Sequence, residues 1–159
     1  MQIPADADPT MLRALARTHA AADDRDEVFE AIAEHPAADA TVLDELLALA
    51  PASPAVANAV TMSRRVAEST LRRLQATAPW PGVRDHAEMG LLELELTRAD
   101  PATFAAIVAR YADHPSLSLG VRYRISTHPR TPDELLRVLA GDDDSAGEAA
   151  RARLRSSEG

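Results

Sequence analysis

The stretch that decides the fold is ISTHPRTPDELLRVLA, residues 125–140. It places His128 directly before Pro129, and a residue that precedes proline is disfavoured in the α-helical conformation. Glu134 stands three residues after Thr131, which is the spacing of a capping box and predicts the start of a helix. We therefore interpret the stretch as a turn between two helices, rather than as a histidine positioned for chemistry.

Helix signals of the same kind recur along the chain, whereas strand signals do not. Asp8, Ser53 and Asp100 are each followed by proline, and this pairing is typical of an N-cap and the first helical turn. The chain is 46% hydrophobic but only 3% aromatic, so the core must consist of Leu, Ala, Val and Ile. These observations predict an all-α fold.

Mostly apolar residues stand at matching offsets after five marker positions: His128, Asp100 and His35, then Ser63, which fits more loosely, and Asp8, which fits least. The residues seven, eight and eleven positions later are Leu135, Leu136 and Leu139; Ile107, Val108 and Tyr111; Thr70, Leu71 and Leu74; Val42, Leu43 and Leu46; and Leu15, Ala16 and His19. From the N-terminus, the markers are 27, 28, 37 and 28 residues apart. The long interval contains ATAPWPGV, which we interpret as an irregular insertion at about residues 76–83.

A repeat of this length indicates a solenoid, because each unit is too small to bury its own apolar face and must stack on its neighbours. The period near 28 is shorter than the roughly 34 residues of a tetratricopeptide unit. We expect a short right-handed α-solenoid of four or five stacked two-helix repeats. It would form a single helical-repeat domain over residues 1–159.

Two segments resemble the bacterial variant leucine-rich repeat: HPRTPDELLRVLAGDD (128–143) and, less closely, HPAADATVLDELLALAPASP (35–54). That unit carries an Asn-Pro or His-Pro turn, a Thr-Pro helix start and then LLxxLAxD, and VRYRIS (121–126) is similar to its VRxxVA segment. The resemblance covers about two-thirds of the chain and implies a curved stack of α-helices and short helices. Spacings of 27 and 28 are long for that family, so a generic HEAT-like repeat is the alternative. The Cys-rich iron–sulfur segment of some such proteins is missing, so no redox role carries over.

All 17 basic residues are arginine, which is typical of a GC-rich bacterial genome. The chain has no cysteine, which excludes disulfides, iron–sulfur clusters and thiolate zinc sites. No apolar run approaches the roughly 18 residues that cross a bilayer, and the N-terminus lacks the pattern of a secretory signal. We expect a cytoplasmic protein.

The net charge of −8 is concentrated near the N-terminus, because residues 1–50 hold 11 acidic residues and 3 arginines. The rest of the chain is balanced. A general nucleic-acid binder needs a basic face, so a nucleic-acid partner is disfavoured. The acidic third is expected to be a solvated surface, and the docking of a basic partner is the alternative.

No enzyme signature emerges from the candidate chemical residues. His35, His114 and His128 each precede proline, where an imidazole can satisfy a backbone group of the turn. His86 and Glu93 lack the i, i+4 spacing of zinc ligands, and the glycines form no phosphate loop. We expect no catalytic residue, no metal and no cofactor. The run Asp142–Asp144 is expected to cap the last helix.

Two features are candidates for partner binding. Trp80, the only tryptophan, lies between two prolines in the apparent insertion, and tryptophan is a favoured interface anchor. The alternative is that Trp80 fills a gap left by the irregular unit. The second feature is a set of arginines, of which Arg65, Arg72 and Arg73 would share a helical face. A solvated outer face is the alternative. The full set is Arg64, Arg65, Arg72, Arg73, Arg122 and Arg124.

These expectations favour a non-enzymatic adaptor or scaffold that binds a protein or peptide on its concave face. The first alternative is a nucleic-acid-binding protein similar in fold to the HEAT-like DNA glycosylases. It would place Arg64, Arg65, Arg72 and Arg73 on phosphates, with Trp80 near a base. The second alternative is a regulatory subunit that acts only when docked to an enzyme.

Overall fold

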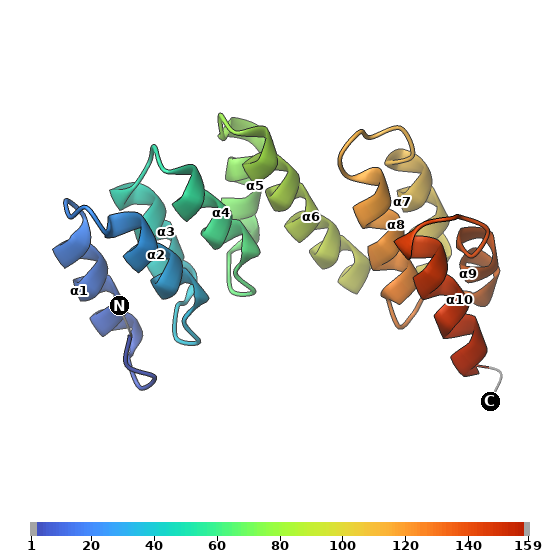
Figure 1. Cartoon of the computed structure of the whole chain (residues 1–159), viewed down its shortest axis with the longest axis horizontal. Coiled ribbons are helices and arrows are strands. Elements are labelled where there is room, and N and C mark those ends of the chain that lie inside the picture. The colour runs from blue at the N-terminus through green and yellow to red at the C-terminus, as the bar shows by residue number, and fades with distance from the viewer. Residues whose placement is uncertain (1–2, 158–159) are drawn as a thin grey trace. The chain divides into compact units, whose positions relative to one another are not determined.

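Figure 1 shows the computed structural model of the chain, which describes residues 3–157. Within these residues there are ten α-helices, one short 3₁₀ helix and no strand, which confirms the predicted all-α class. The elements are α1 (Pro9–His19), α2 (Arg25–Glu34), α3 (Ala40–Leu49), α4 (Pro54–Met62), α5 (Glu68–Thr77), α6 (Pro81–Arg98), η1 (Pro101–Thr103), α7 (Phe104–Arg110), α8 (Ser118–Thr127), α9 (Asp133–Leu139) and α10 (Ser145–Ser157). None of the helices described is long and apolar enough to span a membrane.

The chain divides into two compact units, Met1–Leu91 and Leu92–Gly159. The division falls within α6. Thr77 ends α5 and Pro81 begins α6, so the connection between these helices is residues 78–80. The remaining positions of the insertion predicted at residues 76–83 belong to helices. The single helical-repeat domain over residues 1–159 stays a prediction.

Among α1 to α4 of the first unit, helices pack both on the next helix and on the next but one. Helix α1 contacts α2 and α3, α2 contacts α3 and α4, and α3 contacts α4. Helices of about ten residues are marginal in water, so their stability must come from this burial of apolar faces. The side chains buried between them include Leu12, Val28, Phe29, Ile32, Val42, Leu43, Leu46, Val56 and Val60.

Polar side chains of the first unit are linked at nearly constant sequence separation. Four such links join residues that are 26 to 28 positions apart, and each connects a helix or its N-cap to the next helix but one. This separation matches the 27 and 28 residues between the first sequence markers. The links are Arg17 with Glu45, Ser53 with Asp26, Thr70 with Asp44, and His86 with Asn58.

The predicted N-caps at Asp8, Ser53 and Asp100 are confirmed. Each side chain accepts a hydrogen bond from a backbone N–H two or three residues later, at 2.8, 3.2 and 3.0 Å respectively. Asp100 caps η1, which leads directly into α7. Each cap satisfies a backbone donor that has no partner within the helix.

The capping box predicted at Thr131 and Glu134 is wrong. Helix α9 begins at Asp133, and the buried Thr131 hydroxyl instead donates to the carbonyl of Ile125 at 2.5 Å. The hydroxyl therefore satisfies the last turn of α8, rather than the first turn of α9.

Ser145 and Glu148 have the same spacing as Thr131 and Glu134, which predicts a second capping box, but Ser145 is the first residue of α10 and not its N-cap. The carboxylate of Asp144 accepts from the backbone N–H groups of Ala146 and Gly147 at 2.9 and 3.1 Å. The expected cap of the last helix is thus confirmed for Asp144 alone, since Asp142 of the same run pairs with Arg122.

The five sequence markers fall into two structural classes. His35, Ser63 and His128 each end a helix with extended backbone, and each donates its N–H to the carbonyl three residues earlier. Asp8 and Asp100 instead begin helices. The apolar offsets still locate the core best after the markers that end helices, where Val42, Leu43, Leu46, Thr70, Leu71, Leu74, Leu136 and Leu139 are buried.

In the second unit, α8 packs on α7, α9 and α10, and α10 also packs on α9. Two arginines bind backbone carbonyls near the turn between α8 and α9. Arg153 donates to the carbonyls of Pro129 and His128 in this turn. Arg130, in the turn itself, donates to the carbonyls of Leu96 and Thr97 in the last turn of α6. The core residues include Phe104, Ile107, Val121, Ile125, Leu136, Leu139, Ala146 and Ala150.

We expect Ser53→Ala to lower the free energy of unfolding by about 1–2 kcal/mol, because it removes the cap of α4. It also removes the hydroxyl that donates to Asp26 at 2.7 Å, which is the main reason that the pKa of this carboxyl lies below 3.8. Urea denaturation and a carboxyl NMR titration measure the two effects. Ser69→Ala, at an exposed position of α5, is the control. Unchanged stability together with an unchanged Asp26 pKa contradicts this prediction.

Gly147→Ala is expected to destabilise the second unit by about 1–3 kcal/mol or more, because there is no room for a methyl group. A Cβ atom at this position would lie 2.0 Å from the carbonyl oxygen of Asp142. Gly82→Ala is the matched control, since a Cβ atom there meets nothing within 4 Å. Calorimetric melting of both variants tests the prediction, and equal melting temperatures would contradict it.

Candidate functional site

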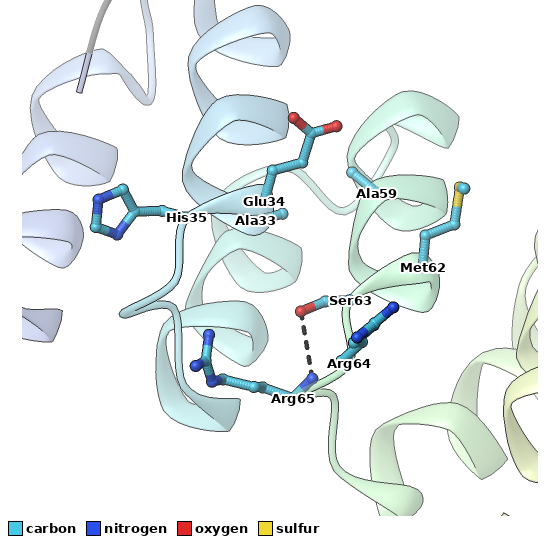
Figure 2. A pocket seen from close by; sticks show the side chains of 8 residues that line it. All are labelled: Ala33, Glu34, His35, Ala59, Met62, Ser63, Arg64 and Arg65. Atoms are coloured by element: carbon cyan, nitrogen blue, oxygen red, sulfur yellow. Dashed lines mark hydrogen bonds between the residues drawn. The ribbon is translucent and has the colours of Figure 1, made fainter. Parts of the chain in front are cut away.

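A pocket of about 350 Å³ lies in the first unit, where the C-terminal ends of α2 and α4 face each other (Figure 2). Two helix ends and the loop after α4 form its walls, and the side chain of Arg65 extends from this loop toward the α2 side of the view. Arg64 stays beside Met62 and Ser63. The lining residues are Ala33, Glu34, His35, Ala59, Met62, Ser63, Arg64 and Arg65.

Local sequence explains why the chain opens a pocket here. Helix α2 stops at Glu34 because His35 precedes proline. Helix α4 stops at Met62, and α5 does not begin until Glu68, so residues 63–67 form a loop. The backbone N–H of Arg65 donates weakly to the Ser63 hydroxyl, at 3.5 Å. The two arginines therefore belong to a loop between helix ends, and not to a helix face.

This placement corrects one prediction. Arg65, Arg72 and Arg73 were expected to share a helical face, but Arg65 precedes the first residue of α5 by three positions. Arg72 and Arg73 follow Arg65 by seven and eight residues, but Arg65 is outside the helix, so this spacing does not place it on their face. Only Arg72 and Arg73 lie on the helix.

Arg64 and Arg65 differ from the other arginines of the first unit. Both are exposed, and neither guanidinium forms an ion pair or a hydrogen bond with any residue that the structure describes. Every other arginine in Met1–Leu91 has a partner. Arg13 and Arg17 pair with Glu45, Arg25 with Asp26, Arg72 with Glu68 and Arg73 with Asp44, and Arg84 donates to the carbonyl of Ala78.

The pocket also contains groups that oppose the arginines. Glu34 is exposed at its edge, and two helices end there, which adds roughly half a negative charge at each helix end. Ala33 and Ala59 provide small apolar surfaces, and Met62 is 69% exposed. The pocket thus combines two unpaired cations, one anion and an exposed apolar side chain. It contains the components of a binding site for a charged and partly apolar group.

The other predicted binding residues do not line this pocket. Arg72 pairs with Glu68, and Arg73 pairs with Asp44. Arg122 contacts Asp142 and Asp144 at 2.5 and 2.8 Å, and Arg124 contacts Glu93 at 2.8 Å. These four guanidinium groups are therefore already occupied by carboxylates.

Trp80 is half-buried and lies directly before α6. Its carbonyl accepts a hydrogen bond from the N–H of Arg84, so Trp80 directly precedes the first turn of that helix. Arg64 and Arg65 thus both line one pocket, whereas Trp80 lies on the connection between α5 and α6. The binding role of Trp80 stays a prediction.

The three His-Pro turns share one hydrogen bond, which confirms their expected structural role. In each turn the ring Nδ1 accepts from the backbone N–H two residues later, at 3.1 Å for His35, 3.4 Å for His114 and 3.3 Å for His128. His35 also bonds through Nε2 to the carbonyl of Pro4 at 3.1 Å. An accepting Nδ1 requires the neutral imidazole with its proton on Nε2. Within the described residues, no group of three His, Cys, Asp or Glu side chains is placed to hold a metal ion.

The surroundings of His128 affect the pKa of its imidazole. Burial lowers the pKa of its imidazole below 6.5, and the nearby charges of Arg130 and Arg153 lower it further, while Glu93 acts in the opposite direction. The ring also meets the Phe104 ring edge-on, with centroids 5.1 Å apart. The folded protein therefore favours the neutral histidine that the turn requires.

No known protein family, curated protein or solved structure matches this chain. The resemblance to the variant leucine-rich repeat therefore stays a prediction.

Sequence reasoning identified both arginines of the pocket but missed the pocket itself. The signal that was present is Ser63, which stands 28 residues after His35 and ends its helix in the same way. Helices α2 and α4 end alike, 28 residues apart, and their C-terminal ends lie side by side at the pocket. The arginines directly after the second helix end then line the space between them.

The neutral His128 predicts a specific pH dependence. Because its folded pKa lies below the unfolded value of 6.5, its contribution to stability is present above pH 6.5 and is lost as pH falls through the folded pKa. His128→Asn keeps an acceptor for the turn but does not titrate. We expect the free energy of unfolding of this variant, measured by urea denaturation from pH 7.5 to 5, to fall less steeply than that of the wild type. Equal slopes contradict the prediction.

Proposed function

We propose that the protein is a non-enzymatic adaptor that binds a protein or peptide partner on the concave face of a short right-handed α-solenoid. In this proposal the ten helices form five two-helix repeats, α1–α2 to α9–α10. The packing of α1 on α3, of α2 on α4 and of α8 on α10 supports stacked repeats of this kind. The resemblance of residues 35–54 and 128–143 to the variant leucine-rich repeat belongs to the same proposal.

The observation that carries a binding role is that the two arginines of the pocket have no side-chain partner among residues 3–157. Guanidinium groups that no carboxylate occupies retain their full set of donors for a partner. Arginine is also enriched at protein interfaces, where it contributes much of the binding energy. In a chain that pairs the other arginines of the same unit, Arg64 and Arg65 are the best candidates for contact with a partner.

The nucleic-acid alternative has weaker support. It requires Arg64, Arg65, Arg72 and Arg73 to act together on phosphates, but two of the four are held by Asp44 and Glu68. The net charge of −8 also opposes approach to a polyanion.

We expect no measurable binding of duplex or single-stranded DNA at about 50 mM salt, a low salt concentration that favours phosphate contacts.

The adaptor proposal predicts a stoichiometric protein complex. Affinity purification of the tagged full chain from its source cells, followed by mass spectrometry, identifies candidate partners. Each candidate is then purified and mixed with the chain. We expect at least one to co-elute in size-exclusion chromatography at a fixed ratio and to bind with a Kd in the micromolar range or tighter, which corresponds to at least about 8 kcal/mol. If no purified candidate forms a complex, the adaptor proposal is wrong.

A further inference from the structure

We propose that the pocket between the ends of α2 and α4 binds the carboxylate of an aspartate or glutamate in a peptide segment, with Arg64 and Arg65 as its ligands. This inference rests on the proposed function and names the chemistry that the partner must present. One arginine donates two parallel hydrogen bonds to both oxygens of a carboxylate. Arg64 and Arg65 extend in different directions from the loop after α4, so each offers such a pair of donors on its own side of the pocket (Figure 2).

Charge balance favours a single carboxylate over a more highly charged anion. The two guanidinium groups contribute two positive charges, and Glu34 contributes one negative charge. The C-terminal ends of α2 and α4 add a further partial negative charge at the same place. A carboxylate carries one negative charge, whereas a phosphate carries about 1.5 to 2 at neutral pH and is repelled more strongly by Glu34 and the helix ends.

The apolar part of the pocket indicates which kind of residue stands next to the acidic residue in the bound peptide. Met62 is 69% exposed beside Arg64, and its flexible thioether side chain adapts to apolar groups of different shapes. Ala59, three residues earlier on α4, also lines the pocket. The recognised segment is therefore an acidic residue next to an apolar residue.

The peptide backbone finds complementary groups in the same pocket. The last carbonyls of a helix have no partner within the helix and accept hydrogen bonds from a ligand. Glu34 is a further acceptor at the edge of the pocket. Backbone N–H groups on either side of the bound acidic residue can donate to these acceptors, so the opposing charges help to orient the peptide.

The test is a selection with a random library of octapeptides that are acetylated at the N-terminus and amidated at the C-terminus. The full chain is the bait, in three forms: wild type, R64Q/R65Q and R72Q/R73Q. The second double variant is the matched control, because it also removes two exposed arginines, but from a helix face where both are ion-paired. Circular dichroism verifies that all three forms are folded.

The wild type and R72Q/R73Q are expected to select peptides with Asp or Glu beside an apolar residue. We expect R64Q/R65Q to bind these peptides at least about tenfold more weakly, since the charge-assisted hydrogen bonds are lost. R64K/R65K keeps the charges but loses the bidentate geometry, so its affinity should be intermediate. Phosphoserine in place of the acidic residue is expected to weaken binding.

Three results would overturn this inference: selected peptides that lack an acidic residue, selected peptides that bind R64Q/R65Q as tightly as wild type, or no selected peptide at all. Tighter binding of the phosphoserine peptide overturns the assignment to a carboxylate. None of these results decides the adaptor proposal, which depends on a complex with a purified partner protein. Conversely, a partner complex that is unaffected by R64Q/R65Q supports the adaptor proposal and contradicts the proposal that this pocket binds a carboxylate.

Discussion

Helices of about ten residues bury too little apolar surface to be stable alone, and this constraint governs the architecture of the protein. In the first unit the constraint is met among α1 to α4, where α1 and α2 each pack on the next helix and on the next but one, and α3 packs on α4. Polar side chains follow the same rule, since Ser53 bonds to Asp26 and Thr70 bonds to Asp44 across almost the same sequence separation. A repeated interval of about 28 residues is thus the distance along the chain between surfaces that must meet.

Short helices also require many turns, and each turn leaves backbone groups without helical partners. The His-Pro turns meet this need with an imidazole that accepts a backbone N–H, as a side chain of Asn or Asp does in an Asx turn. Unlike those residues, an imidazole gives up its acceptor when it is protonated. Burial and two neighbouring arginines keep His128 neutral, so the charges that surround this turn favour the tautomer on which it depends.

Much of the fold follows from local sequence rules, because proline and capping residues act within a few positions. Asp8, Ser53 and Asp100 begin helices as predicted, and the apolar offsets after His35 and Ser63 locate buried positions. Thr131 was misassigned because its buried hydroxyl donates to the carbonyl of Ile125 in the preceding helix, a contact between segments that local spacing does not reveal. The pocket was missed for a related reason. It lies between the ends of two helices, and the spacing of residues within one helix does not predict which helix ends lie side by side.

The distribution of arginine partners follows from the same geometry. An exposed ion pair contributes only about 0–1 kcal/mol, so pairing Arg72 or Arg73 changes stability little, but it occupies the guanidinium group. Those two arginines lie on a helix, within reach of Glu68 one turn earlier and of Asp44 on α3. Arg64 and Arg65 lie in a loop between helix ends, where the side chains of the described residues form no such pair with them. The break between α4 and α5 that creates the pocket thus also leaves its two cations available.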